Sequence, residues 1–194
     1  MCLKCGKPLH GPSDLIFTCI TCRHRRLYFS EARAVGVYDG ALREAIHALK
    51  FRGRRVLAKP LGALMAETAA VDARLRTAQL IIPVPLHPRR LRERGFNQSG
   101  LLASELAGRL NLPLAESLVA RRRQTQAQSG LSFDERRANV RDAFIPIGRV
   151  NASAVLLVDD VISTGFTVSA CARALKLGGA IDVTVIAAAM AVLE

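Results

Sequence analysis

Short, almost continuously apolar runs alternate with amphipathic segments along most of the chain. The runs have the length of buried strands and lack a regular polar alternation; they are residues 32–40, 79–85, 154–160 and 181–190. Between the first two runs lies a segment in which Leu42, Ile46 and Leu49 fall on one helical face. Strands of this kind, separated by helices, predict an α/β fold with a parallel sheet flanked by helices.

Other segments complete the predicted order of elements. From apolar periodicity and flanking Pro or Gly, helices are expected at residues 41–51, 56–74, 99–110 and 167–177. Short strands are expected near residues 116–120 and 142–147. Two polar stretches are predicted as loops, namely the arginine-rich residues 87–98 and residues 121–141.

Two Cys-x-x-Cys pairs lie at the N-terminus, ahead of this alternating pattern. Cys2 and Cys5 are separated from Cys19 and Cys22 by 13 residues. The spacing is typical of a zinc ribbon, in which two turns each give two thiolates to one Zn²⁺ ion. A segment this short has little core of its own, so bound metal would supply most of its folding energy. We therefore predict that these four cysteines are the ligands of a structural zinc ion.

The two patterns divide the chain into a zinc ribbon, residues 1–30, and an α/β domain, residues 31–194. No membrane insertion is expected, because the longest apolar stretch, VTVIAAAMAVL, has about half the residues that a spanning helix needs. The N-terminus carries cysteines where a signal peptide would have a basic start and an apolar stretch. We expect a cytoplasmic location, where cysteines stay reduced.

Basic residues are concentrated in the middle of a chain whose formal net charge is +12. Residues 43–59 hold six Lys or Arg against Glu44, and residues 83–141 hold eleven Arg against five acids, whereas residues 142–194 are net acidic. Such asymmetry indicates a polyanionic ligand or partner, such as phosphate, pyrophosphate or nucleic acid. A solvated basic face is the alternative, and charge alone does not separate the two.

Aromatic residues follow the ribbon, which is itself flanked by basic residues. Tyr28 and Phe29 come shortly after Arg25 and Arg26. Basic residues with aromatics could contact nucleic acid. They could equally form a solvated surface with a small hydrophobic plug between the domains, and this second interpretation is slightly favoured.

Two adjacent acids end the run VLLVDD and precede a turn rich in hydroxyls, in the stretch 155–167. In an open parallel sheet, ligands bind beyond the carboxyl ends of the strands. The turn leads to a helix N-terminus, where backbone N–H groups and the helix dipole favour a phosphate. Asp159 and Asp160 would repel that phosphate, so we expect them to accept hydrogen bonds from adjacent sugar hydroxyls. A ribose 5-phosphate satisfies both halves of the pattern.

At this point the residues resemble a known family. VLLVDDVISTGFT is similar to the phosphoribosyl-diphosphate (PRPP) motif of type I phosphoribosyltransferases. KFRG, PVPLHPRRLRERGFNQS, RRANVRDAF and the N-terminal cysteines further resemble the ComF family, and the resemblance covers essentially the whole chain. It implies a type I phosphoribosyltransferase-like sheet with a small N-terminal zinc ribbon.

The resemblance implies roles for particular residues. The acids would hold the ribose 2- and 3-hydroxyls and the turn would hold the 5-phosphate; the implied PRPP-binding residues are Asp159, Asp160, Val161, Ser163, Thr164, Gly165 and Thr167. A pyrophosphate loop would follow the strand 79–85, with Pro85, Leu86, His87, Arg89, Arg90, Arg92 and Arg94. Mg²⁺ would accompany PRPP, and residues 124–140 would form a flexible hood over the site.

One residue departs from the motif. Phe166 stands where the family usually has a small residue, between Gly165 and Thr167. A bulky ring at this position would either narrow the phosphate pocket or cover its outer side.

Two functions are consistent with these patterns. The first is a PRPP-binding enzyme that transfers the phosphoribosyl group to an unknown acceptor, linked through the resemblance to DNA uptake in natural transformation. The second is a non-catalytic accessory protein that binds single-stranded DNA and contacts the DNA-uptake machinery, with a regulatory or vestigial PRPP site. The sequence marks no acceptor and no catalytic residue.

Overall fold

The protein is described by a computed structural model that covers residues 1–9, 18–123, 140 and 142–192. Within these residues, a four-stranded parallel sheet has the order β1-β6-β5-β2. Its strands are β1 (Glu31–Val37), β2 (Leu80–Pro83), β5 (Ala154–Ile162) and β6 (Asp182–Met190). An antiparallel pair, β3 (Val119–Arg121) and β4 (Phe144–Pro146), lies beside the sheet.

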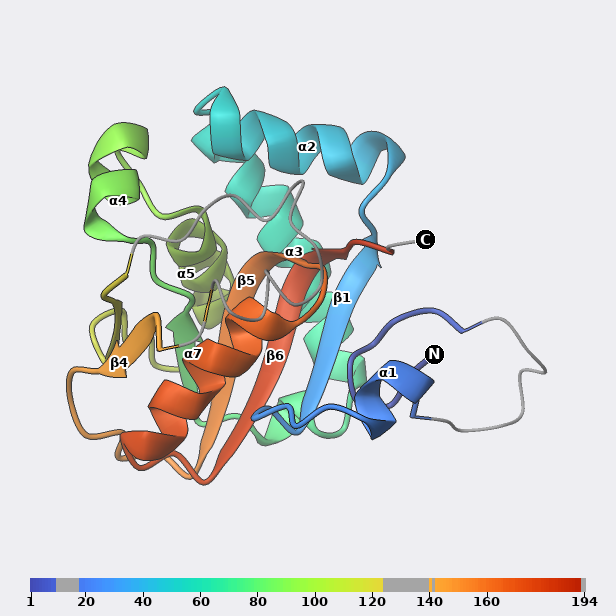
Figure 1. Cartoon of the computed structure of the whole chain (residues 1–194). Helices are drawn as coiled ribbons and strands as arrows, with labels where there is room; N and C mark the ends of the chain where they lie inside the picture. The colour runs from blue at the N-terminus through green and yellow to red at the C-terminus, as the bar shows by residue number, and fades with distance from the viewer. Residues whose placement is uncertain (10–17, 124–139, 141, 193–194) are drawn as a thin grey trace.

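Helices cover both faces of the parallel sheet (Figure 1). The helices and short 3₁₀ turns are α1 (Ile20–Arg23), α2 (Gly40–Phe51), η1 (Arg55–Leu57), α3 (Ala58–Val71), η2 (Leu75–Thr77), α4 (Pro88–Arg94), α5 (Gln98–Leu110) and α7 (Phe166–Leu177). The predicted fold class, a parallel sheet flanked by helices with an N-terminal cysteine cluster, is confirmed.

The core has two layers because neighbouring residues of a strand face opposite sides of the sheet. Val155 and Leu157 of β5 belong to the apolar cluster that includes α7. Leu156 and Val158 belong to the cluster that includes α2, α3 and α5. All four side chains are at most 1% exposed. An apolar run without polar alternation is what a strand buried on both faces requires, and this explains the pattern in the sequence.

Three boundaries differ from the prediction. The predicted loop 87–98 contains the helix α4, Pro88–Arg94, which is followed by Gly95 in the left-handed conformation. Proline suits the first turn of a helix and glycine suits the position after its end, so a start signal and a stop signal were both present in the sequence. The predicted helix 56–74 is split into η1 and α3, and the short strand expected near 116–120 is β3, which ends one residue later. The predicted hood, 124–140, lies outside the described residues except for Val140.

No helix in the described part of the chain has both the length and the apolar character needed to span a membrane. The cytoplasmic location stays a prediction, as does the division of the chain into domains at residue 30.

Candidate functional site

A cavity of about 400 Å³ opens at the carboxyl ends of the parallel strands. Each strand is followed by a residue that lines it: Tyr38 after β1, Val84 after β2, Ser163 after β5 and Ala191 after β6. The remaining walls come from the end of α2, from α4, from the start of α5 and from β3. The chain therefore places its concave site at the edge of the sheet where open α/β folds bind ligands.

The two acids lie within β5, two and three residues before its end, and both line the cavity. Asp160 Oδ2 forms an ion pair with Lys50 Nζ of α2 at 2.5 Å. Asp160 Oδ1 accepts a hydrogen bond from the backbone N–H of Val161 at 2.8 Å. Oδ2 is buried, and among the described residues the Lys50 ammonium is the group that compensates its charge.

Asp159 has a different environment from its neighbour. Its Oδ1 accepts hydrogen bonds from Ser99 Oγ and from the backbone N–H of Asp160, each at 2.9 Å. Burial, and after it the negative charge of Asp160, raises the pKa of Asp159 to about 7, while Lys50 and the Ser99 hydrogen bond oppose the shift. Asp159 therefore changes its charge near neutral pH, at the surface of the cavity.

The arginines of α4 divide between two faces of the helix. Arg90 and Arg94, four residues apart, line the cavity together with Leu86 and His87. Arg89 is exposed and pairs with Glu93 at 2.9 Å, and Arg92 is also exposed. Residues at i and i+4 share a helical face, so the helix directs only part of this basic segment toward the cavity. Pro85, Arg89 and Arg92 of the predicted pyrophosphate loop do not line the cavity.

Burial lowers the pKa of two arginines beside the cavity, and the nearby acids oppose this shift. Desolvation lowers the pKa of Arg94, and the nearby Asp160 opposes that shift. Desolvation likewise lowers the pKa of Arg121 in β3, opposed by Asp159. Arg121 also stacks over the ring of Phe144 at 5.4 Å, which holds its guanidinium beside the cavity. Cations thus approach the acid pair from α2, α4 and β3.

Three polar residues of the site had no role in the sequence interpretation: Lys50, Ser99 and Arg121. Lys50 and Ser99 occur in the segments KFRG and FNQS, which marked the family resemblance without indicating a contact. Arg121 begins a run of three arginines that looked like loop. Only the packing of α2, α5 and β3 around the end of β5 brings them to the acids.

Residues 163–165 connect β5 to α7. Together with the first two helical residues they make up the segment called the turn 163–167, which forms one end of the cavity. Gly165 is the residue before the helix, with φ of 77°, a left-handed conformation that glycine adopts without strain. Ser163, Gly165 and Thr167 line the cavity, as does Val161. Thr164 does not line it, and its hydroxyl is buried without a hydrogen-bond partner among the described residues.

Phe166 lies outside the cavity lining, in the first turn of α7. Its side chain is 9% exposed, and the guanidinium of Arg25 stands 5.2 Å from the ring centroid. Of the two outcomes expected for a bulky residue here, the ring therefore covers the outer side of the turn and does not narrow the cavity.

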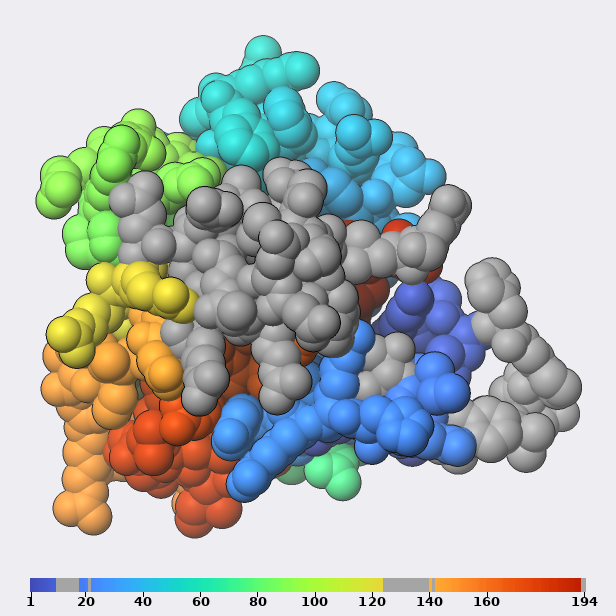
Figure 2. Space-filling model, in the orientation of Figure 1, coloured from blue at the N-terminus to red at the C-terminus, as the bar shows by residue number. Residues whose placement is uncertain are grey.

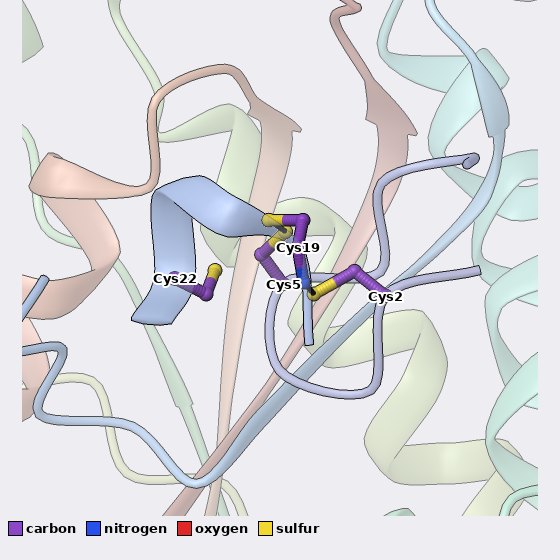
Figure 3. A group of neighbouring side chains, drawn as sticks. All are labelled: Cys2, Cys5, Cys19 and Cys22. Atoms are coloured by element: carbon purple, nitrogen blue, oxygen red, sulfur yellow. Dashed lines mark hydrogen bonds between the residues drawn. The ribbon is translucent and has the colours of Figure 1, made fainter. Parts of the chain in front are cut away.

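The four N-terminal cysteines form a compact cluster (Figure 3). Their sulfur atoms all lie within 4.8 Å of one another and none is in a disulfide. A tetrahedral ion with zinc–sulfur bonds of about 2.3 Å requires sulfurs roughly 3.8 Å apart, and Cys5 Sγ and Cys19 Sγ are 3.9 Å apart. The hydrogen bond between Cys22 and Cys5 lowers the pKa of Cys5 to about 5 and raises the pKa of Cys22, so Cys5 is the thiolate of this pair and Cys22 its donor. The cluster could hold a metal ion.

We expect one zinc ion per chain in the purified protein. Replacement of Cys19 by serine removes one of four thiolates and should lower zinc content to well below half, because structural sites depend on all four ligands. Zinc is measured by elemental analysis, and the Co²⁺-substituted protein by its thiolate-to-metal absorption. The control is Cys171→Ala, a buried cysteine of α7 that lies outside the cluster. Equal zinc content in both variants would contradict a four-cysteine site.

Comparison with known proteins gives one domain match and three relatives. Residues 97–192 match the phosphoribosyl transferase domain, a range that contains α5, β5, the turn 163–167 and α7. The chain is 34% identical over 188 residues to the DNA utilization protein YhgH of Salmonella typhimurium, covering 95% of this chain and 82% of that protein. It is 31% identical over 191 residues to competence protein F of Haemophilus influenzae, with the same coverage. It is 32% identical over 152 residues to competence protein ComFC of Streptococcus pneumoniae, covering 78% of this chain and 64% of that one.

Proposed function

The chain belongs to the ComF family, and on this premise we propose that it binds PRPP in the cavity and transfers the phosphoribosyl group to an acceptor during DNA uptake. The observation that carries the proposal is the buried acid pair beside a helix-terminal turn, with cations facing it across one cavity. The family relatives, named for competence and DNA utilization, support the link to DNA uptake. Contact with the DNA-uptake machinery and action in the cytoplasm are parts of the same proposal.

Each end of the cavity suits a different part of PRPP. Carboxylates accept hydrogen bonds from adjacent hydroxyls, so Asp159 and Asp160 are assigned to the ribose. The turn 163–167 offers N–H groups at the positive end of the α7 dipole, so it is assigned to the 5-phosphate. Arg90 and Arg94 lie across the cavity, where their guanidinium groups can hold the diphosphate.

The proposed chemistry needs electrostatics more than a nucleophilic side chain. Breaking the bond between ribose C1 and the diphosphate oxygen develops positive charge on the sugar and negative charge on the leaving group. Mg²⁺, carried in with PRPP, would neutralise part of the diphosphate charge. Arg90 and Arg94 add to this neutralisation, and the ionised acids hold the ribose in place and stabilise the positive charge beside it.

A second function is favoured by one specific observation, an exposed aromatic residue on a basic rim. The Phe51 side chain is 61% exposed, and the guanidinium of Arg94 lies 5.5 Å from its ring centroid. Exposed arginines follow it in the connection to η1, and Figure 2 shows α2 and α4 side by side along the top of the molecule. A ring on a basic surface can stack a base of single-stranded DNA. In this alternative the protein is an accessory protein of DNA uptake, with the PRPP site regulatory or vestigial.

A pair of matched variants on α4 tests the proposal and separates it from the alternative. Arg90→Gln and Arg92→Gln remove the same charge two residues apart, but only Arg90 lines the cavity. We expect Arg90→Gln to weaken the binding of Mg²⁺–PRPP by at least about tenfold, since a charge-assisted contact to phosphate is lost. We expect Arg92→Gln to leave it nearly unchanged. Calorimetric titration measures both.

The same two proteins are titrated with a single-stranded oligonucleotide at increasing salt. Non-specific contacts to a phosphate backbone depend on net charge, so binding on the rim predicts equal losses for the two variants and a steep fall with salt. If the unmodified protein does not bind PRPP, or if both variants lose PRPP affinity equally, the cavity is not the PRPP site. Release of pyrophosphate with candidate acceptors then tests turnover.

A further inference from the structure

We propose that residues 25–30, the connection between the cysteine cluster and β1, position the turn 163–167, so that metal loading of the cysteines controls the anion end of the cavity. The assignment of an anion to that turn rests on the proposed function, but the mechanical coupling does not. Phe29 is the positioning residue, and Phe166 provides the second contact. Figure 1 shows the connection running from α1 into the base of β1.

The first contact is between Phe29 and Gly165. Phe29 is 1% exposed and belongs to the apolar cluster under α7. A Cβ atom on Gly165 would lie 3.7 Å from Cζ and 3.8 Å from Cε1 of the Phe29 ring, so the ring packs directly against the glycine backbone. Gly165 is the left-handed residue that sets the shape of the turn. A change in the position of Phe29 therefore removes a packing contact that limits the motion of this glycine backbone.

The second contact reaches the first turn of α7 from the same connection. The guanidinium of Arg25 covers the Phe166 ring at 5.2 Å. The backbone N–H of Tyr28 donates to Ser169 Oγ at 3.1 Å. Residues 25–29 thus contact the end of the turn at position 165 and the first helical turn of α7 at positions 166 and 169.

The same connection is tied to the cysteine cluster. Lys4, between the first two cysteines, has its Nζ 5.7 Å from the centroid of the Phe29 ring. Its carbonyl accepts a hydrogen bond from the N–H of Ala32 at 2.9 Å. Gly6 lies so close to β1 that a Cβ would be 2.5 Å from the carbonyl oxygen of Ala32. The first Cys-x-x-Cys turn is therefore docked on the strand that follows Phe29.

Metal loading would hold these contacts in place because the ribbon has few buried apolar side chains of its own. Of its described apolar residues, Met1, Leu3 and Ile20 are 65%, 46% and 75% exposed. A small segment without a core depends on its metal for order. Loss of the ion would free the N-terminal end of the connection, next to the cysteine cluster. Arg25 and Phe29 would then no longer be held against Phe166 and Gly165.

Amide hydrogen exchange on the full-length protein tests the coupling without any ligand. The zinc-loaded protein is compared with the same protein after chelation. We expect exchange to rise at least about tenfold in residues 163–169 as well as in residues 2–8, because local protection follows packing. The control is residues 98–103 at the start of α5, on the opposite side of the cavity, where exchange should be unchanged.

Two variants test the contact in the metal-loaded protein. Phe166→Leu keeps an apolar side chain but removes the ring beneath Arg25, and should raise exchange in residues 163–169. Phe166→Tyr keeps the ring and should restore the exchange of the unmodified protein. This rescue separates a specific aromatic contact from a general loss of stability, and Phe166 lies outside the cavity, so it cannot act by contacting the ligand.

Three exchange results would overturn the coupling. The first is unchanged protection of residues 163–169 when residues 2–8 lose theirs, and the second is a uniform rise in exchange that includes residues 98–103. The third is equal exchange in the Phe166→Leu and Phe166→Tyr variants. Titration of zinc-loaded and chelated protein with inorganic phosphate and with PRPP is then read separately. Absence of PRPP binding by the zinc-loaded protein refutes the proposed function and leaves the exchange result standing. Equal PRPP affinity with and without zinc refutes the control of the anion end.

Discussion

The Asp159→Asn variant is expected to lose PRPP binding and yet to unfold at higher denaturant concentration than the unmodified protein at pH 8. Both expectations follow from the burial of this carboxyl group, which is 8% exposed at the wall of the cavity. Both hydrogen bonds that it receives go to Oδ1, so an asparagine oxygen can accept them unchanged. The substitution therefore removes a charge and an acceptor with little change in packing.

The sign of the stability effect depends on where the proton is held. In the folded protein the pKa of Asp159 is raised to about 7 by burial and by Asp160, against 3.8 for an ordinary aspartate. Between these two values the folded state keeps a proton that the unfolded state releases, so the contribution of Asp159 to stability falls as the pH rises. Above pH 7 the full penalty for a buried carboxylate remains, on the order of a few kcal/mol. Asparagine carries no such penalty, so the advantage of the variant should grow from pH 4 to pH 7 and then level off.

Denaturant unfolding at pH 5 and pH 8 measures the stability effect, and calorimetry measures PRPP binding at the same pH values. In the unmodified protein we expect affinity to increase as the pH passes about 7, because the ionised Asp159 is the better acceptor for ribose hydroxyls. The control Asp142→Asn makes the same chemical change at an exposed residue and should alter neither property. A variant that is less stable than the unmodified protein at pH 8 would show that the Asp159 charge stabilises the fold.

Replacement of Lys50 by methionine should have the largest effect on stability. Asp160 is 3% exposed, and Lys50 Nζ is its ion-pair partner at 2.5 Å. Removing one partner of a buried ion pair leaves a charge without compensation, at a typical cost of about 3 to 5 kcal/mol. The charge of Asp160 raises the pKa of Arg94, so Arg94 is close enough to compensate part of that charge when Lys50 is removed. We therefore expect the free energy of unfolding to fall by about 3 kcal/mol, the lower end of that range.

Denaturant unfolding of the double variant Lys50→Met with Asp160→Asn tests this explanation. Because the uncompensated charge is gone, the double variant should recover most of the lost stability. The control Lys59→Met removes an exposed lysine of α3 and should change stability by less than about 0.5 kcal/mol. If the double variant is as unstable as the single one, packing of the lysine side chain, not the ion pair, is what α2 contributes to the site.

The order of strands and helices could be predicted because each element carries its own signal. Leu156, Leu157 and Val158 are apolar in succession, as only a strand buried on both faces allows, and the structure buries them in two separate clusters. The helix α4 was missed because seven residues with four arginines show no apolar periodicity. Its boundaries were nevertheless marked by Pro88 and Gly95.

The sequence predicted only the part of the candidate site whose residues are close together in the chain. Asp159, Asp160 and the turn 163–167 are continuous in the chain, so a strand end followed by a helix start indicated their use. Lys50, Ser99 and Arg121 are between 38 and 110 residues away from the acids that they face, and no local pattern relates them. Their positions follow from the packing of α2, α5 and β3.

By itself, the sequence determined the layers of the fold, the four cysteines that come together, and the acid pair beside the turn, since all of these depend on spacing along the chain. The tertiary structure alone decided which cations face the acids, which arginines of α4 line the cavity, and that Phe166 lies outside it under Arg25. The physical reason is that burial, charge compensation and aromatic contact join residues that are distant in the chain. These contacts set the pKa of Asp159 and the support of the turn, and both are absent until the sheet and its helices have packed.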